Sequence, residues 1–302
     1  MMKEVIVYQI DSFTKEKFKG NPAGVVLDAE NLTAEEMQLI ARELNNSETA
    51  FVLKPDPNDP FDYHVRYFTP TTEVPICGHA TIGALYAKAI EDRLDSCTIT
   101  INTQVGVLPI DILKEGNDYQ ITMTQGSFSM ESAFNSSITQ EIVEALGLKL
   151  ENLNKECPIQ IASTGHSKVM IGINSKTLLN TLNPDFTALS HLSKKINCNG
   201  YFVFTFDSDD KEVLTYGRMF APAIGIQEDP VTGNANGPLG GYLIQNKIIE
   251  ASDGTMEFIA RQGETINRMG QIKVQVTSKN HIPEIIRITG NAVPVFRTVM
   301  YI

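Results

Sequence analysis

The sequence predicts an α+β protein of two pseudo-symmetric lobes, each a barrel-like, mostly antiparallel sheet around a central helix. The main observation is a repeat: the pattern R-x-F-x-P occurs at residues 66–70 and again at 218–222 of a 302-residue chain. Each copy is followed by a Gly-polar-Ala turn and a helix of small residues, at 78–86 and 233–242. Solenoid repeats are only about 20 to 50 residues long, so duplication of a whole domain explains this spacing better.

Short runs of β-branched and aromatic residues dominate both halves and predict strands. Their number, and the turn residues between them, indicate antiparallel sheets that curl. The expected strands cover residues 5–10, 24–27, 49–53, 63–68, 97–101, 105–113, 119–123, 168–173, 201–206, 272–276 and 285–288.

Two amphipathic segments predict helices on the surface. In the first, Thr33 and Glu36 form a capping box before an apolar stripe over residues 37–44. In the second, Thr139 is the expected cap, residues 142, 143 and 146 form the apolar face, and Gly147 is the stop signal.

The two repeated helices have a different composition from these surface helices. Residues 80–90 are apolar nearly all the way round, with Lys88 as the main charge, and a helix without a broad polar face is expected to be buried. Its counterpart carries Pro238 close to the expected start, where a missing N–H has little effect. Each lobe is therefore predicted to wrap its sheet around one central helix. The polar turn at 114–117 sets the predicted boundary, which gives lobes of residues 1–116 and 117–290.

Composition narrows the function classes. The net charge of −11 comes with no basic patch, which disfavours nucleic acid as a partner. No segment approaches the roughly 18 apolar residues of a membrane span, and residues 1–7 lack the features of a signal peptide. The four cysteines are far apart, without a Cys/His cluster at metal-ligand spacing. We therefore expect a cytoplasmic protein without a metal site.

The starts of the two central helices are candidate ligand sites. Their first backbone amides have no acceptor within the helix and carry the positive end of the helix dipole. The first helix begins at Gly78 and His79, and the second at Gly233 and Asn234. Glycine allows close approach of the backbone, so we expect a small anionic substrate, such as a carboxylate, in a cleft onto which both helix starts face.

Four segments, at residues 20–26, 47–51, 77–83 and 228–233, closely resemble the phenazine-biosynthesis PhzF-like family. The resemblance implies the diaminopimelate epimerase fold, in which the C-terminal strand, residues 291–302, returns to the first lobe. It also implies a homodimer and an isomerase that needs no metal or organic cofactor. The phenazine-pathway member of the family isomerises a dihydro-hydroxyanthranilate by moving a proton.

By this resemblance, Glu48 matches the catalytic acid/base of the family, while His79 and Asp229 match its partners. Asn21 belongs to a matching segment and is an expected substrate contact. Asn234 departs from the pattern, because many members have Ser at that position; this departure bears on substrate identity more than on proton transfer.

Structural interpretations stay open for several of these residues. Glu48 follows a helix and opens an apolar run, so it can also be a solvated carboxylate at a strand end; His79 can be a plain helix residue and Asp229 a turn residue. The Asn21-Pro22 pair can be only a turn. The two motif arginines, Arg66 and Arg218, are as suited to structural ion pairs as to ligand contact.

Two other functions are alternatives to the isomerase. Two-thiol epimerases and racemases of this fold place a cysteine at the start of each central helix. Cys77 precedes the first helix, but residues 229–233 contain no cysteine, which disfavours the two-thiol mechanism and favours Cys77 as a core residue. The second alternative is a binding protein that kept the ligand site and lost turnover.

Overall fold

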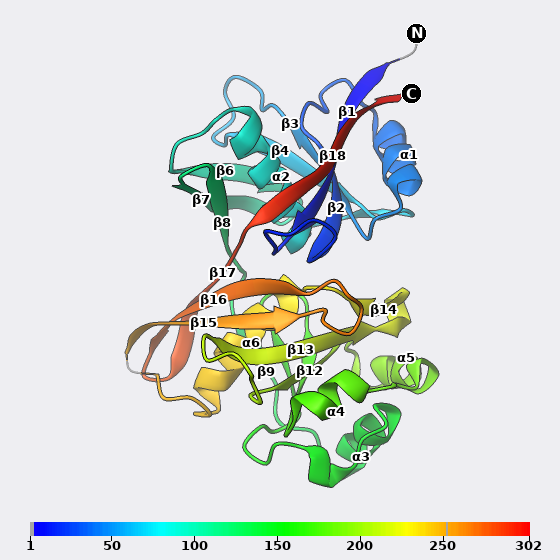
Figure 1. The fold of residues 1–302 in the computed structure, drawn as a ribbon, viewed down its shortest axis with the longest axis vertical. Helices are drawn as coiled ribbons and strands as arrows, with labels where there is room; N and C mark the ends of the chain where they lie inside the picture. The colour runs from blue at the N-terminus through cyan, green and yellow to red at the C-terminus, as the bar shows by residue number, and fades with distance from the viewer. Residues whose placement is uncertain (1–2, 252) are drawn as a thin grey trace. The chain divides into compact units, whose positions relative to one another are not determined.

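The computed structural model describes residues 3–251 and 253–302, and the chain forms two compact units (Figure 1). The first unit runs to Thr124 and includes Thr289–Ile302, and the second is Gln125–Ile288. These boundaries differ from the predicted ones by eight residues at the first crossing and two at the second. The reason for the first difference is local: residues 114–117 form the hairpin turn between two paired strands, so the turn lies inside the first unit.

The sheet of the first unit is mostly antiparallel. Its first strand pairs antiparallel with the second and with the last strand of the chain, which lies beside it in Figure 1. Among the pairings of the described residues, those of β2 with β3 and of β4 with β6 are parallel. The strands are β1 (Glu4–Ser12), β2 (Asn21–Val26), β3 (Thr49–Leu53), β4 (Tyr63–Phe68), β5 (Glu73–Val74), β6 (Cys97–Thr103), β7 (Gly106–Glu115), β8 (Asp118–Thr124) and β18 (Ala292–Tyr301).

Two helices cover opposite faces of this sheet. The central helix α2 (Gly78–Glu91) packs against β1, β2, β3, β7, β8 and β18, and it is buried from His79 to Ala89. Helix α1 (Ala34–Leu44) has the predicted capping box and contributes Met37, Ile40 and Ala41 to a separate core cluster with Val5 and Val7 of β1. Strand β1 thus serves two cores, because its residue Ile10 packs against α2 at Gly83.

The second unit repeats this plan. Its strands are β9 (Ser129–Met130), β10 (Gln160–Ser163), β11 (Lys168–Ile173), β12 (Tyr201–Thr205), β13 (Val213–Ala221), β14 (Ile226–Asp229), β15 (Gly254–Gln262), β16 (Gly270–Lys279) and β17 (Ile282–Gly290), the last of which runs on into the first unit. Parallel pairings join β11 with β12 and β13 with β15. All the predicted strands are present, whereas β5, β9, β10, β13, β14 and β15 were not predicted.

The central helix of the second unit is α6 (Gly233–Gln245), which packs against β10, β11 and β16. The expectation that Pro238 lies close to the helix start is wrong, because Pro238 lies inside the helix, beyond its first turn. It therefore carries no N–H for the carbonyl of Asn234. At Gly240, a Cβ would lie 2.6 Å from a methyl group of Val276, so glycine allows the helix to approach β16 closely.

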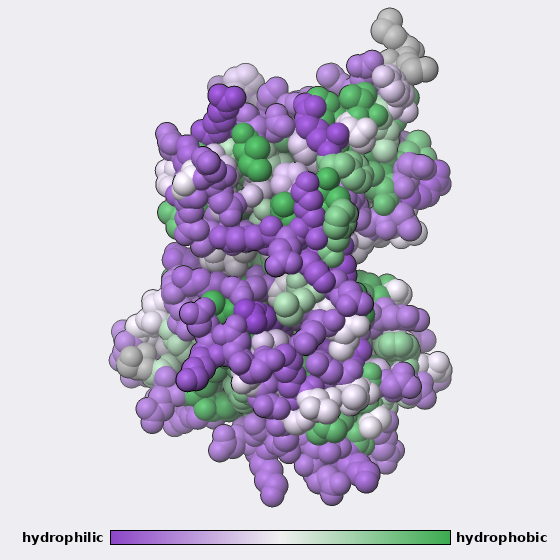
Figure 2. Space-filling model, viewed as in Figure 1, coloured by the Kyte–Doolittle hydropathy of each residue, from purple (hydrophilic) through white to green (hydrophobic). Residues whose placement is uncertain are grey.

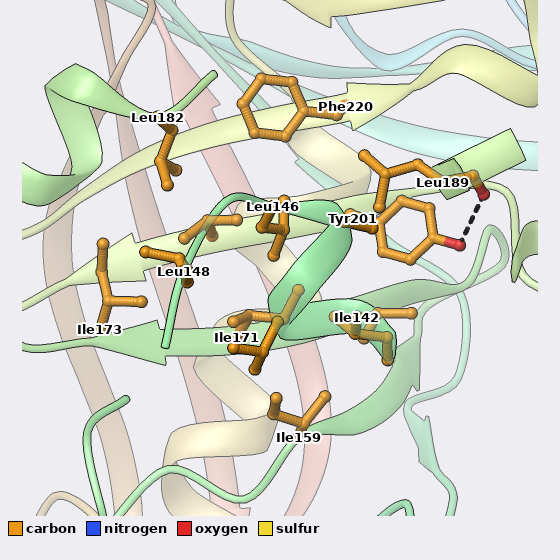
Figure 3. Packing of buried hydrophobic residues seen from close by; sticks show 14 of the residues in the cluster. Ile142, Leu146, Leu148, Ile159, Ile171, Ile173, Leu182, Leu189, Tyr201 and Phe220 are labelled. Carbon is orange, nitrogen blue, oxygen red and sulfur yellow. Dashed lines mark hydrogen bonds between the residues drawn. The ribbon is translucent and has the colours of Figure 1, made fainter. Parts of the chain in front are cut away.

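Outer helices form a second core in this unit. The helices are α3 (Ser136–Ala145), α4 (Lys176–Thr181) and α5 (Phe186–Ile196), and the short 3-10 turns are η1 (Leu150–Asn152) and η2 (Pro222–Ile224). The predicted cap Thr139 is wrong: α3 begins earlier, after Asn135, whose side chain accepts from the amide of Ile138. Figure 3 shows the packing of Ile142, Leu146 and Ile171 in this core, with the Tyr201 hydroxyl donating to the carbonyl of Leu189.

The visible surface is largely hydrophilic, with scattered apolar patches (Figure 2). On β18, Phe296, Val299 and Tyr301 have exposed fractions of 46%, 42% and 62%. Among the described residues, no helix has the length and apolar character needed to cross a membrane.

Candidate active site

In the first unit, the predicted residues Glu48 and His79 lie together at the start of α2. Glu48 immediately precedes β3, whose residues are nearly all buried, and His79 is the second residue of α2 after Gly78. Their side chains have exposed fractions of 18% and 8%. The strand end therefore holds a carboxylate beside the first turn of the central helix, largely shielded from water.

The imidazole of His79 connects three side chains. Its Nε2 lies 3.5 Å from a carboxylate oxygen of Glu48 and 3.3 Å from the hydroxyl of Ser47. Its Nδ1 lies 3.3 Å from the Cys77 sulfur. When Nε2 carries the proton it donates to the Ser47 hydroxyl, which leaves Nδ1 to accept from the thiol. Imidazole and carboxylate together form an acid/base pair suited to proton transfer.

The backbone around this pair is held by neighbouring elements. Ser12 of β1 donates its hydroxyl to the carbonyl of His79 over 2.7 Å, and the carbonyl of Glu48 accepts from the amide of Gly24 over 3.2 Å. Asn21 is 1% exposed and pairs with Ser12 in the β1–β2 ladder. Asn21 begins β2, so the interpretation of Asn21-Pro22 as only a turn is wrong; Gly20, with φ of 61°, makes the turn before it.

The N-cap of α2 is also fixed through its carbonyl. The hydroxyl of Thr81 donates to the carbonyl of Cys77 over 2.7 Å, so the Tyr67 hydroxyl, 2.6 Å from Thr81, donates in turn to Thr81. Burial raises the pKa of Tyr67, which keeps this donor protonated. The first turn of α2 is thus rigidly placed.

In the second unit, Asp229 lies at the end of β14, just before α6. Asp229 is 8% exposed, and the Thr232 hydroxyl donates to its carboxylate. Gln262 of β15, 1% exposed, ties this segment together. Its amide donates to the carbonyl of Asp229 over 2.7 Å, and its carbonyl accepts from the amide of Thr232 and from the side chain of Asn236.

A second glutamine holds the first residues of α6. The side-chain amide of Gln125 donates to the carbonyl of Gly233 over 3.0 Å and to the side chain of Asn234 over 3.5 Å. The Thr164 hydroxyl donates to the other end of the same amide over 2.8 Å. Asn234 is therefore oriented by a neutral partner.

Both motif arginines form structural ion pairs. Arg66 makes a bidentate contact with Glu73 of β5, at 2.8 and 2.9 Å, and stacks over Phe68. Arg218 does the same with Glu228 of β14, at 3.0 and 2.7 Å, and with the ring of Phe220. In both units, the arginine of the R-x-F pattern therefore joins its own strand to the next strand, which precedes the central helix. These strand pairs are β4 with β5 and β13 with β14.

The position equivalent to Cys77 in the second unit is Thr232, because these residues are the N-caps of α2 and α6. The described part of the chain therefore offers one thiol at one central helix start. Burial raises the pKa of Cys157 to about 12 and also raises that of Cys198.

Sequence patterns did not predict Ser47, Gln125 and Gln262. Ser47 lies in a segment matched by the family resemblance, which was the one available signal. The two glutamines lie far along the chain from their partners, at separations of 108 and 30 residues for Gly233 and Thr232. A lone glutamine has no distinctive sequence pattern.

A hollow of about 730 Å³ lies in the first unit, away from Glu48 and His79. Two ion pairs lie in its lining, Lys88 with Asp92 and Arg297 with Glu91. The lining also holds more acidic than basic side chains, so the hollow is poorly suited to an anionic ligand; the acidic residues are Glu4, Asp28, Asp62, Glu91 and Asp92, and the basic ones Lys54, Lys88 and Arg297.

Comparisons with known proteins identify the family. The profile of the family described as "Phenazine biosynthesis-like protein" matches residues 10–298. An uncharacterized isomerase of Clostridium acetobutylicum is 53% identical over 298 residues, which is 99% of this chain and 98% of the relative. The trans-2,3-dihydro-3-hydroxyanthranilate isomerase of Pseudomonas aeruginosa is 31% identical over 286 residues, covering 93% and 94% of the two chains.

A solved structure agrees with these matches. The crystal structure of a PhzF-family phenazine biosynthesis protein of Bacillus anthracis superposes with a TM-score of 0.89 at 34% identity, covering 99% of this chain and 100% of the other. The chain belongs to the phenazine biosynthesis-like (PhzF) family, a family of isomerases.

Proposed function

We propose that this protein is a cofactor-independent isomerase that moves a proton between two carbons of a small, carboxylate-bearing substrate. The observation that carries the proposal is the contact of 3.5 Å between Glu48 and His79 at the start of α2. The name of the relative from Pseudomonas aeruginosa suggests trans-2,3-dihydro-3-hydroxyanthranilate as the first substrate to test.

Glu48 is proposed as the proton carrier. Its carboxylate takes a proton from one carbon and returns it to another, provided that both carbons lie within about 3 Å of its oxygens in one bound pose. His79, whose Nε2 lies 3.5 Å from the same carboxylate, is proposed to orient it. A single carboxylate suffices for this shift, so no second thiol is required.

Backbone amides are proposed to bind the anionic group of the substrate. Gly78 and His79 start α2, and Gly233 and Asn234 start α6. The first amides of a helix bind anions well because the helix offers them no acceptor. We also propose that Asn21 contributes to binding and that Asp229 takes part in catalysis.

An isotope experiment tests the reaction class. The protein is incubated in deuterated buffer with trans-2,3-dihydro-3-hydroxyanthranilate and with a panel of small carboxylates, and deuterium incorporation is followed by NMR. A true substrate shows isomerisation that depends on Glu48. A ligand that binds without any exchange or turnover would favour the alternative of a binding protein.

We further propose a cytoplasmic homodimer. The exposed apolar side chains of β18 support a partner surface, and the described cysteines are all free thiols, which suits a reducing compartment. Sedimentation velocity at several protein concentrations tests the dimer, and a monomer at all of them would contradict it.

A further inference from the structure

Three donor groups of different chemical kinds meet at the start of α2. Cys77, His79 and Glu48 each offer one ligand atom, and these three atoms lie within 4.8 Å of one another. Among residues 3–251 and 253–302, this is the only such group of three His, Cys, Asp or Glu side chains. Spacing rules in the sequence could not find it, because Glu48 lies 29 residues before Cys77.

We propose that this trio is a zinc site that regulates the enzyme. Zinc in proteins takes thiolate, imidazole and carboxylate ligands at about 2.0 to 2.3 Å, usually in tetrahedral geometry. Ligand atoms around such an ion are separated by roughly 3.3 to 3.8 Å. The Cys77 sulfur lies 3.3 Å from Nδ1 of His79, and a Glu48 oxygen lies 3.5 Å from the other ring nitrogen, Nε2. An ion binds only one of these nitrogens, so the side chain that faces the other must rotate toward the ion, from a starting separation within 4.8 Å.

The site has three protein ligands and one position left for water. On binding, the Cys77 thiol loses its proton to solvent and a bond forms between zinc and sulfur, while His79 and Glu48 supply a neutral nitrogen and a carboxylate oxygen. One ring nitrogen of His79 binds the ion, so its hydrogen bond on that side is replaced. The mixed donor set favours zinc over magnesium, which prefers oxygen ligands.

The surrounding fold limits the rearrangement that binding needs. The carbonyls of Cys77, His79 and Glu48 are each held by a hydrogen bond, from Thr81, Ser12 and Gly24 respectively. Only side-chain rotations are therefore required, and a ligand set on a fixed backbone binds a metal more tightly. Glu48, at 18% exposure, gives the ion access from solvent.

Zinc at this position would inhibit the enzyme, because it occupies the carboxylate and imidazole that are proposed to move the proton. This consequence rests on the proposed function, whereas binding itself does not. The two are therefore measured separately, binding without substrate and inhibition with it.

Binding is tested on the full-length, reduced protein by titrating Zn²⁺ against a chromophoric chelator, with Mg²⁺ as the comparison metal. We expect one tight equivalent of zinc. Cys77→Ala and Glu48→Gln should each weaken the zinc affinity by about 100-fold. Loss of a residue that only supports a metal ligand costs about 10- to 100-fold, and loss of a ligand itself should cost at least as much. Cys97→Ala is the matched control, since Cys97 is an exposed thiol outside the trio, and it should leave the affinity unchanged.

Co²⁺ provides a spectroscopic check, because a cobalt–thiolate bond gives a charge-transfer band that Cys77→Ala should abolish and Cys97→Ala should keep. Tight zinc binding that survives in Cys77→Ala, or no tight equivalent in the parent protein, would overturn the site. Melting curves confirm folding; if Cys77→Ala does not fold, unchanged zinc affinity in Glu48→Gln overturns it instead. Zinc binding in a protein without isomerase activity would leave the site intact and count only against the proposed function.

Discussion

The starts of the two central helices differ in chemistry although the backbone around them repeats. At α2, the N-cap Cys77, the helix residue His79 and the strand-end residue Glu48 form a cluster of groups that can exchange protons. At α6, Gln262 and Gln125 surround the helix start with neutral amides, and Asp229 is the carboxylate among them. The first start is suited to acid/base chemistry, and the second to holding a fixed arrangement of hydrogen-bond donors and acceptors.

The repeated R-x-F-x-P pattern explains what the two units share. In each, the arginine pairs with a carboxylate on the strand that leads to the central helix, so the pattern positions the helix start rather than a ligand. The two units thus share the arginine–glutamate ion pair, while the side chains at the starts of their central helices differ. The following tests are ordered from the largest expected effect to the smallest.

Glu48→Gln should lower turnover by about 100- to 10,000-fold, the usual contribution of one general acid/base group. The amide keeps the shape of the side chain, so ligand affinity should stay within about tenfold, or about 1.4 kcal/mol. Steady-state rates and a binding titration measure both quantities. Glu43→Gln, an exposed neighbour on α1, is the control and should behave like the parent protein.

Arg218→Ala should destabilise the protein by about 3 to 5 kcal/mol, because it leaves Glu228 as a buried charge without its partner. Arg66→Ala should cost only about 1 kcal/mol, since that ion pair is more exposed. The exposed fractions of the two arginine side chains, 10% and 24%, set this order. Thermal midpoints of both variants test this order. An equal loss of stability in the two variants would show that the two copies of the motif are energetically equivalent.

Gln262→Leu should destabilise the protein by about 1 to 3 kcal/mol, because the amide of Thr232 and the side chain of Asn236 lose a buried acceptor. The start of α6 then loses its fixed geometry, so KM for a confirmed substrate should rise more than kcat falls. Gln140→Leu, on the exposed face of α3, is the matched control for both readouts. A variant with parent-like stability would mean that Gln262 does not hold the segment.

Cys77→Ala should reduce turnover far less than Glu48→Gln does. The thiol has no counterpart at Thr232, so a mechanism with two thiol bases lacks one of them. Rates of both variants are compared on the same substrate. An active Glu48→Gln together with an inactive Cys77→Ala would reverse the assignment in favour of thiol chemistry.

Local patterns in the sequence predicted much of the fold. Runs such as those at residues 49–53 and 201–206 became β3 and β12, and the capping box at Thr33 became the start of α1. The missed strand β13 contains Gly217 and Arg218, and the missed β15 contains Glu257 and Arg261, so neither has a clean apolar run. Their positions in the middle of a sheet come from pairing with neighbours, which local propensity does not encode.

The sequence by itself determined the family, the internal repeat and the candidates Glu48, His79 and Asp229, because these lie in contiguous motifs. Only the tertiary structure decided which side chains complete each helix start. Glu48 reaches His79 across 31 residues of chain, and Gln262 reaches Asp229 across 33. Contacts of this kind depend on strand pairing and helix packing between distant segments, and single residues such as Gln262 leave no pattern in the sequence that could reveal them.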